Sequence, residues 1–250
     1  MAMRVYVLHL LRAEKRRQNA RDLLRNCGVA GSIWPAVDGA AMSSTDLNQS
    51  YGADLCEPAY PFALRTGEIG CFLSHRQIWA DMQDRSEDAA LIIEDDAGLD
   101  LPLFQQAMAL ATEHVHDLGY IQLQTRAPRG PSRLIDKNGP CALVLPEVAG
   151  LRTTAQVVSR TAAAQLLARS DPFDRPVDTY VQSFWHTGLK PAMITPSGVL
   201  EIADQLDGST IQSADKTLWE KARREVARAR YRAAVRRISR KTPTPVSYDE

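Results

Sequence analysis

The chain of 250 residues has few cysteines and no long apolar run. Its four cysteines form no Cys-x-x-Cys pair and lack the spacing of a structural metal site, so they are interpreted as reduced, partly buried thiols. No apolar stretch approaches the roughly 20 residues of a membrane-spanning helix. Residues 5–11 are apolar, but His9 and the basic run after it favour a first strand over a signal peptide. We therefore expect a soluble, cytoplasmic protein.

The sequence also lacks a glycine-rich phosphate loop with its lysine, and it contains no internal repeat. Enzymes that hold phosphates on such a loop are therefore disfavoured. The length allows one large domain, or one domain with an appendage, and the composition is ordinary for a globular protein.

Three consecutive carboxylates end a short apolar run at residues 88–96, Asp-Ala-Ala-Leu-Ile-Ile-Glu-Asp-Asp. The run has the length of a buried strand. Because side chains alternate along a strand, we expect Glu94 and Asp96 on one side and Asp95 on the other. Two hard oxygen ligands at a strand end suit Mg²⁺ or Mn²⁺, especially an ion that bridges substrate phosphates. A solvated acidic turn after a buried strand is the alternative.

A strongly basic segment lies near the C-terminus, although the formal net charge is zero. Residues 216–241 hold eleven Lys or Arg and two Glu, so they carry +9 and the remainder −9. The segment lacks Gly and Pro, and its apolar residues recur at helical spacing, which predicts a basic amphipathic helix. Such a helix either lies on an anionic membrane or packs on the acidic body of its own chain. The acidity of the body argues against nucleic acid as a partner.

The rest of the sequence alternates between expected strands and helices. Besides the acidic run at 88–96, strands are expected at 4–10, 33–37, 120–124, 142–145, 155–158 and 192–195. Helices are expected at 13–26, 67–83, 103–114, 161–169 and 175–186, while 40–65 has no clear period and 127–140 reads as a loop. This alternation, with a few consecutive strands, predicts an α/β fold with a mixed sheet.

Three polar clusters fall at the carboxyl ends of expected strands, where ligands bind in open α/β sheets. They are His9 with Arg12, Asp38-Gly39, and Glu94 to Asp96. Their coincidence favours a metal over a solvated turn. In the helix at 67–83, Glu68 and His75 share a face with apolar residues, where a lone histidine is more often a core residue than a ligand.

Two segments resemble glycosyltransferase family 25: Gly-Glu-Ile-Gly-Cys-Phe-Leu-Ser-His at 67–75, followed by Ile78-Trp79, and the run at 90–96. That family includes bacterial lipooligosaccharide galactosyltransferases and resembles the collagen galactosyltransferases. The resemblance covers roughly residues 3–200, in the family's order. Supporting matches are the basic stretch at 10–17, Trp-Pro-Ala-Val-Asp-Gly at 34–39, Val-Val-Ser-Arg at 157–160 and Pro-Val-Asp at 176–178. The chain departs from the family at His9, where Asn is usual, and at Gln156, where an aromatic residue is usual.

The resemblance implies a GT-A-like fold, with helices flanking the mixed sheet, and transfer of a sugar from a nucleotide diphosphate donor, usually UDP-galactose. A leaving diphosphate needs its charge neutralised, so Mn²⁺ or Mg²⁺ is expected on Glu94 and Asp96, with Asp95 nearer the donor sugar or ribose. Arginine suits phosphate oxygens. The residues expected to contact the donor nucleotide are His9, Arg12, Arg16, Asp38, Gly39 and Asp95. Those expected to line the donor or acceptor pocket are Glu68, Ser74 and His75.

An inverting transfer needs a base that deprotonates the acceptor hydroxyl, and Asp178 is the candidate because it matches a family motif. The alternative is that Asp178 sits in the first turn of a helix, where the helix dipole favours acids.

We expect a transferase domain over 1–213, the basic helix over 214–241 and a flexible tail over 242–250. The acceptor is expected to be a lipooligosaccharide, a lipopolysaccharide or another glycan, reached by an enzyme attached peripherally to the inner face of the cytoplasmic membrane. Another metal-dependent nucleotide-sugar or nucleotidyl-transfer enzyme would also need paired carboxylates, but the missing phosphate loop weighs against it. A non-enzymatic membrane-docked scaffold leaves the acidic triplet unexplained.

Overall fold

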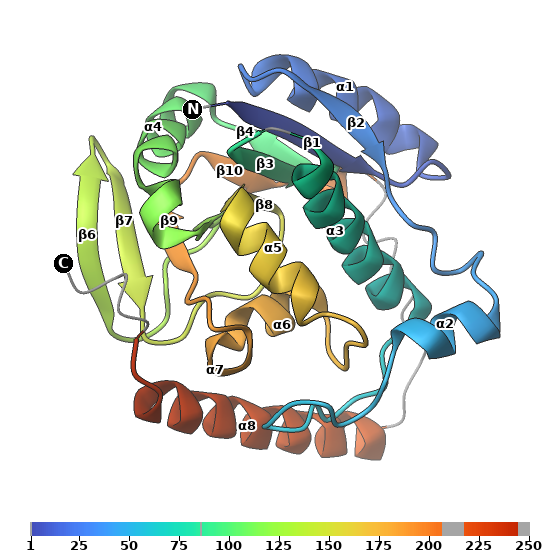
Figure 1. Cartoon of the computed structure of the whole chain (residues 1–250). Coiled ribbons are helices and arrows are strands. Elements are labelled where there is room, and N and C mark those ends of the chain that lie inside the picture. The colour runs from blue at the N-terminus through green and yellow to red at the C-terminus, as the bar shows by residue number, and fades with distance from the viewer. Residues whose placement is uncertain (1, 86, 207–217, 245–250) are drawn as a thin grey trace.

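A mixed eight-stranded sheet forms the centre of the molecule in the computed structural model, which describes residues 2–85, 87–206 and 218–244 (Figure 1). The strand order is β2-β1-β3-β8-β5-β9-β7-β6. The strands are β1 Met3–His9, β2 Gly31–Pro35, β3 Ala89–Glu94, β5 Tyr120–Leu123, β6 Ser132–Asn138, β7 Cys141–Pro146, β8 Ala155–Ser159 and β9 Ala192–Thr195. A second, two-stranded antiparallel sheet pairs β4 Ala97–Leu99 with β10 Val199–Glu201.

Helices cover both faces of the large sheet. They are η1 Glu14–Arg16, α1 Arg17–Asn26, α2 Ser44–Ser50, α3 Thr66–Asp84, α4 Leu101–Leu118, α5 Arg160–Ala168, α6 Val177–Gln182, α7 Phe184–Thr187, η2 Ala203–Gln205 and α8 Leu218–Lys241. The expected α/β fold, a mixed sheet flanked by helices, is confirmed.

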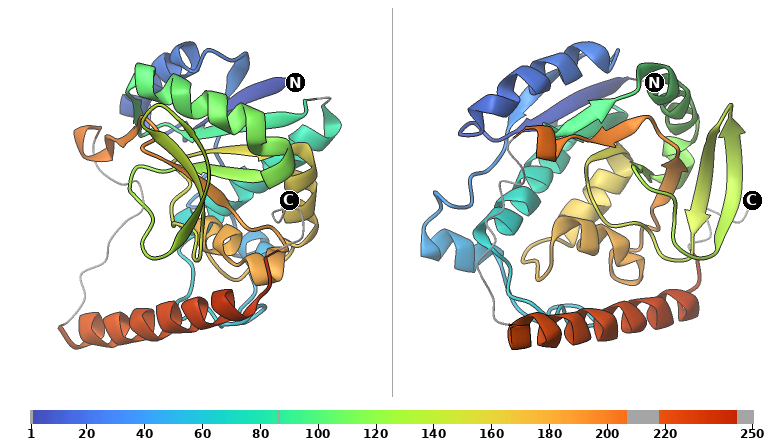
Figure 2. Two further views of the ribbon diagram at one scale, coloured as in Figure 1. Left: turned by 90° about the vertical axis from the view of Figure 1, so that its left-hand side faces the viewer. Right: turned by 180° about the vertical axis from the view of Figure 1, so that it is seen from behind.

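Alternate residues of the central strands enter two separate cores. Val5 and Val7 of β1 pack with α1 and α4, whereas Tyr6 and Leu8 pack with α3 and α5 on the other face. Because both faces are covered, β1 and β3 read in sequence as continuous apolar runs. In Figure 1, α3 and α5 lie in front of the sheet, and the view from behind in Figure 2 shows α1 and α4 on its other side. The sheet is therefore a rigid platform held from both sides.

Two predicted features of the sheet differ from the structure. Segment 127–140, expected as a loop, contains the edge strand β6, whose mostly exposed polar residues give no alternating apolar signal. The short strands β4 and β10, of three residues each, were not predicted either. Short or edge strands bury little, so their sequences carry little pattern.

The predicted helices differ mainly at their ends. The helix expected over 175–186 is interrupted at Ser183, which has non-helical dihedral angles and separates α6 from α7. Helix α3 begins at Thr66, one residue before the expected start, and its N-cap is Arg65. Segment 40–65 contains the short helix α2, whose N-cap Ser43 accepts a hydrogen bond from the Asp46 N–H. Gly28, with φ +69°, follows Cys27, the C-cap of α1.

The basic helix α8 forms over Leu218–Lys241, within the predicted 214–241, of which residues 214–217 lie outside the described ones. It packs on the body of the protein along one side (Figures 1 and 2). Val235 and Ser239 are buried, and the Tyr231 ring contacts the Tyr60 ring edge-on at 5.5 Å. Ser239 donates to the carbonyl of Glu147, and Arg240 Nε donates to Glu147 Oε1 at 2.9 Å. One face of the helix is therefore held by the chain itself.

Among the described residues, no helix combines the length and apolar character needed to cross a bilayer. Of the expected flexible tail over 242–250, residues 245–250 lie outside the described part of the chain.

Candidate active site

The carboxyl ends of the parallel strands β1 and β3 bring His9 and Asp95 together. Leu8 lies opposite Glu94 in the register, and the Asp95 N–H donates to the Leu8 carbonyl at 3.0 Å. The next side chains meet, so that His9 Nδ1 lies 2.7 Å from Asp95 Oδ2, and both residues are buried. Two residues expected to contact the donor are thus bonded to each other.

Arg16 links this pair to the third carboxylate. It ends η1 and is buried, and its Nη1 donates to Asp95 Oδ1 at 2.9 Å and to Asp96 Oδ2 at 3.0 Å. Asn19 Nδ2 holds the turn after β3 by donating to the carbonyls of Asp95 and Ala97, at 2.8 and 2.9 Å. One buried guanidinium therefore offsets part of the repulsion among the acids.

Glu94 and Asp96 form a donor set for a divalent cation. Thr153 Oγ1 donates to Glu94 Oε1 at 2.8 Å. Burial, and then the nearby charge of Asp96, raise the pKa of Glu94 above its usual range. Burial also raises the pKa of Asp96, while Arg16 opposes that shift. A divalent cation would relieve both effects, and carboxylate oxygens are the ligands that Mg²⁺ and Mn²⁺ prefer, so these residues fit such an ion.

Two cavities meet at these carboxylates. The first, of about 190 Å³, is lined by residues that include Arg12, Arg16, Asp38, Gly39, Ser74 and Asp95. The second, of about 500 Å³, is lined by residues that include Tyr60, Glu68, Arg152, Asp178 and Glu201. Glu94, Asp96 and Cys71 line both cavities, so the acidic pair stands at their boundary. We call them the donor-side cavity and the acceptor-side cavity.

The turn after β2 forms one wall of the donor-side cavity. Arg12 Nε donates to Asp38 Oδ2 at 2.7 Å in a partly exposed ion pair. Gly39 allows this turn to approach α3, because a Cβ there would lie 1.8 Å from the carbonyl oxygen of Thr66. The expected donor residues Arg12, Asp38 and Gly39 therefore lie together, and the Gly39 position is explained by packing.

The three pocket residues expected on α3 have different surroundings. Glu68 lines the acceptor-side cavity, and its Oε2 accepts a hydrogen bond from the Arg65 N–H at 2.8 Å, capping the helix. Ser74 Oγ accepts from the Val37 N–H at 2.8 Å and donates to the Gly70 carbonyl at 2.7 Å. His75 is fully buried and is not among the residues that line either cavity.

Asp178 lies in the first turn of α6 and lines the acceptor-side cavity with Glu94 and Asp96. Its Oδ1 accepts from the Thr179 N–H at 2.6 Å and from Thr179 Oγ1 at 3.1 Å. Its Oδ2 accepts from the Arg152 N–H at 3.0 Å. The carboxylate is therefore held in a fixed orientation at the edge of the cavity.

Other residues of the acceptor-side cavity were not predicted. Arg152 has φ +89°, uncommon for a residue other than glycine, and forms an ion pair with Glu201 at the end of β10. Tyr60 comes from the segment before α3 that has no sequence period. These residues lie in loops or at the end of a three-residue strand, where no local pattern marks them.

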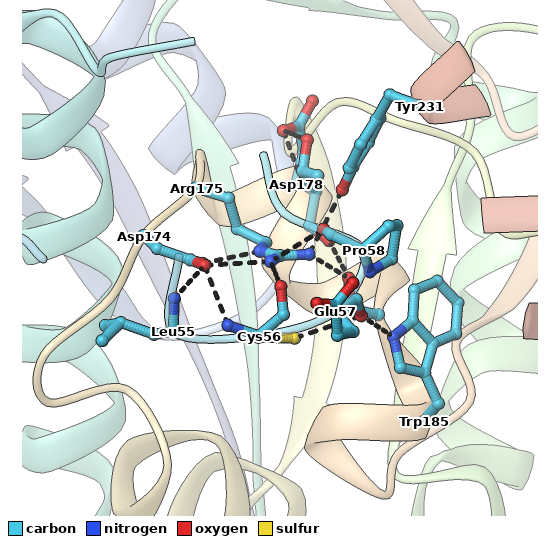
Figure 3. Close-up of polar contacts among 11 residues, drawn as sticks. Leu55, Cys56, Glu57, Pro58, Asp174, Arg175, Asp178, Trp185 and Tyr231 are labelled. Atoms are coloured by element: carbon cyan, nitrogen blue, oxygen red, sulfur yellow. Dashed lines mark hydrogen bonds and ion pairs between the residues drawn. The ribbon is translucent and has the colours of Figure 1, made fainter. Parts of the chain in front are cut away.

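A buried arginine supports this cavity from behind. Arg175 is fully buried and bonds to Asp174 through Nε at 2.6 Å and Nη2 at 3.0 Å (Figure 3). Its Nη2 also donates to the carbonyls of Cys56 and Pro58, and its Nη1 donates to Tyr231 Oη at 3.2 Å. Arg175 thus joins the segment before Tyr60, the residues before α6 and helix α8.

A second cluster of possible metal ligands adjoins the acidic pair. One ligand atom each of Cys71, His75 and Glu94 lies within 4.8 Å of the others. Burial raises the pKa of the Cys71 thiol well above its usual range and lowers the pKa of His75 to about 4. The thiol is therefore protonated and the imidazole uncharged near neutral pH.

Comparison with known proteins gives a family match over half of the chain. The family described as "Glycosyltransferase family 25 (LPS biosynthesis protein)" matches residues 2–129. "Procollagen galactosyltransferase 1" of Danio rerio is 29% identical over 189 residues, which cover 71% of this chain and 30% of the relative. "Inactive glycosyltransferase 25 family member 3" of Homo sapiens is 37% identical over 97 residues, covering 37% of this chain and 16% of the relative.

The chain thus spans less than a third of the length of these curated relatives. Among solved structures, a mutant Drosophila galactosyltransferase in complex with manganese, UDP-Gal and xylobiose is similar at a TM-score of 0.41 with 12% identity. The likeness covers 91% of this chain and 80% of that one.

Proposed function

The chain belongs to glycosyltransferase family 25, and we propose that it transfers galactose from UDP-galactose to a glycan acceptor in a metal-dependent reaction. The observation that carries this proposal is the position of Glu94 and Asp96 at the boundary of two cavities. A transferase must bring two substrates to one reacting centre. A shared pair of carboxylates between two cavities provides such a centre.

The donor nucleotide is assigned to the donor-side cavity. Arg12 and Arg16, which are paired with aspartates of the site, offer guanidinium N–H donors for phosphate oxygens, and Asp38 offers an acceptor for ribose or base hydroxyls and amines. Ligand pockets usually have volumes of about 300–1,000 Å³, so this cavity of about 190 Å³ is small for a whole nucleotide sugar. The sugar end would therefore pass the carboxylates into the acceptor-side cavity.

Mn²⁺ or Mg²⁺ is assigned to Glu94 and Asp96, where it would neutralise negative charge on the leaving diphosphate. Neighbouring side chains fix the positions of these two carboxylates by hydrogen bonds. Thr153 orients Glu94, and Arg16 holds Asp96 while neutralising Asp95.

Asp178 is assigned as the base that takes the proton of the acceptor hydroxyl, in a transfer with inversion. It shares the acceptor-side cavity with the metal pair, and its hydrogen bonds to Thr179 and Arg152 fix its orientation. Oδ2 accepts one hydrogen bond in the structure, which leaves a lone pair for the acceptor hydroxyl.

A panel of nucleotide sugars with Mn²⁺ tests this proposal, with release of the nucleoside diphosphate as the measurement. We expect turnover with UDP-galactose, loss of turnover with a chelator, and recovery with Mn²⁺. No turnover of any donor by the folded protein would contradict the proposal. A matched family relative that bears the name "inactive" makes this measurement decisive.

The acceptor and the location of the enzyme are linked to α8. We propose that the acceptor is a lipooligosaccharide or another membrane-anchored glycan, in keeping with the family's description, and that α8 holds the enzyme on the inner face of the cytoplasmic membrane. The residues that support membrane attachment lie on the face of α8 that points away from the body of the protein. They form an exposed apolar stripe at helical spacing: Trp219, Ala222, Val226, Ala229 and Ala233.

Exposed arginines lie beside this stripe: Arg223 and Arg230 on one side, Arg232 on the other, and Arg236 and Arg237 at its C-terminal end. Trp219 is 78% exposed and Val226 52% exposed, while Tyr231 on the opposite face contacts the body. The apolar residues of the helix therefore belong to two faces. Packing on the body and binding to an anionic leaflet are then compatible, because they use different faces.

Co-sedimentation of the full-length chain with vesicles tests the location. We expect binding to vesicles that contain phosphatidylglycerol, weak binding to phosphatidylcholine, and loss at 1 M salt, where the Debye length is about 3 Å. Replacing Arg223, Arg230 and Arg237 by Gln should weaken binding by roughly 100-fold, since each cation contributes about 1 kcal/mol. The same change at three exposed arginines of α1, Arg17, Arg21 and Arg25, is the matched control. A full-length chain that ignores anionic vesicles at low salt would contradict the proposal.

A further inference from the structure

A cysteine, a histidine and a glutamate lie close together next to the boundary between the two cavities. Cys71 and His75 lie one turn apart on α3, and Glu94 ends β3. One ligand atom of each lies within 4.8 Å of the others. Cys71 and Glu94 line both cavities, so an ion entering from either side reaches this cluster.

The two ring nitrogens of His75 form no hydrogen bond within the part of the chain that the structure describes. Its side chain is fully buried, and neither Nδ1 nor Nε2 has a hydrogen-bond partner there. Buried polar atoms are normally paired, so this imidazole has an unmet bonding capacity next to a thiol and a carboxylate.

We propose that Zn²⁺ binds to Cys71, His75 and Glu94. Thiol, imidazole and carboxylate are the ligands of zinc sites, and three protein ligands with an open fourth position are typical of accessible ones. Sulfur ligands select Zn²⁺ over Mg²⁺ and Mn²⁺. Binding releases the thiol proton, and the open position faces the cavities.

The site has a consequence for transfer, which rests on the proposed function. Zn²⁺ at this cluster uses Glu94, which the proposed Mn²⁺ or Mg²⁺ site also needs. Zn²⁺ would therefore inhibit Mn²⁺-dependent transfer in competition with Mn²⁺. Binding of Zn²⁺ itself does not depend on that function.

Titration of the full-length apoprotein with Co²⁺, followed by displacement with Zn²⁺, tests the site. Co²⁺ takes the ligands of Zn²⁺ and absorbs in the near ultraviolet when a thiolate is bound. We expect this band in the wild-type protein and its loss in Cys71→Ser, with Zn²⁺ affinity falling more than about 100-fold, since loss of a direct ligand exceeds the effect of outer-shell changes. Cys56→Ser and Asp96→Ala should keep the band.

Melting curves of each variant establish that it is folded. No thiolate band in the folded wild-type protein, or a band that persists in Cys71→Ser, would overturn the proposed site. Zn²⁺ binding together with Mn²⁺-dependent transfer that Zn²⁺ leaves unchanged would overturn the inhibition. A protein that binds Zn²⁺ but transfers no sugar with any donor would refute the proposed function and leave the zinc site standing.

Discussion

The donor-side cavity is built at the edge of one sheet, whereas the acceptor-side cavity is assembled from segments that are distant in sequence. On the donor side, neighbouring parallel strands place His9 and Asp95 in contact, and Arg16 ties Asp95 to Asp96. On the acceptor side, Tyr60 and Asp178 come from separate segments joined behind the cavity by Arg175. The donor side thus depends on strand register, and the acceptor side depends on a few long-range contacts.

This difference suits the proposed transfer reaction. A nucleotide diphosphate has a constant shape and charge, which a rigid sheet edge with fixed ion pairs can match. An acceptor wall made of loops can change its residues without disturbing the sheet. Variants on the two sides should therefore separate donor binding from acceptor transfer.

The largest effect is expected from Asp96→Ala on the shared boundary. Loss of one of two metal ligands should lower transfer by about 1,000-fold or more, as a metal contributes several kcal/mol to charge stabilisation. Mn²⁺-dependent donor binding, measured by calorimetry, should be lost as well. The fold should remain intact, as should the activity of the surface control Asp22→Ala. Normal Mn²⁺-dependent turnover in Asp96→Ala would refute the metal assignment.

Asp178→Asn should separate the two cavities. Transfer should fall by about 100-fold or more, a common size for a general base, while donor affinity stays at the wild-type value. Steady-state kinetics and donor titration measure the two effects. A collapse of donor affinity would instead assign Asp178 to the donor site, and unchanged kinetics would make it a structural residue of the α6 first turn.

Asp174→Asn tests how far the acceptor side depends on the Arg175 contacts. The change leaves the buried guanidinium without its charged partner, so we expect about 2 kcal/mol of lost stability. For a chain of this size, that lowers the melting temperature by roughly 4–8 °C. Donor affinity should change less than acceptor KM, because Asp174 also holds the backbone N–H groups of Leu55 and Cys56 ahead of Tyr60.

The stability difference between the wild-type protein and Asp174→Asn should depend on pH. Burial opposes ionisation of Asp174, but the hydrogen bonds and charge of Arg175 outweigh it and lower the pKa of that carboxyl. Its stabilisation is therefore present above the unfolded pKa of about 3.9 and is lost as pH falls through the lower folded value. The stability gap between wild type and Asp174→Asn should narrow below about pH 4. A gap of equal size at pH 7 and pH 3 would contradict this account.

The two sides also differ in how far the sequence predicts them. The apolar runs of β1 and β3 and their polar ends are local patterns, so the acidic cluster and its neighbours could be placed at one sheet edge. The bond from Arg16 to Asp95 and Asp96 was not foreseen, because it depends on the path of the chain after β1. Arg152 and Glu201 carry no local signal, since their meeting depends on the tertiary arrangement of a loop and a short strand.

The smallest effect is expected from Tyr231→Phe, which removes one hydroxyl between α8 and the acceptor side. Tyr231 Oη accepts from Arg175 Nη1, and hydrogen bonds to charged groups contribute about 1.5–3 kcal/mol when buried. Arg175 keeps its bonds to Asp174 and to two backbone carbonyls, so we expect a loss near the lower end of this range. The ring contact with Tyr60 remains, so acceptor KM should rise only a few-fold while donor affinity stays constant. A matched control is Tyr51→Phe, whose side chain packs against the core between the sheet and α3. Weaker donor binding in Tyr231→Phe would show that α8 supports both cavities. It would refute the conclusion that the two cavities depend on separate contacts.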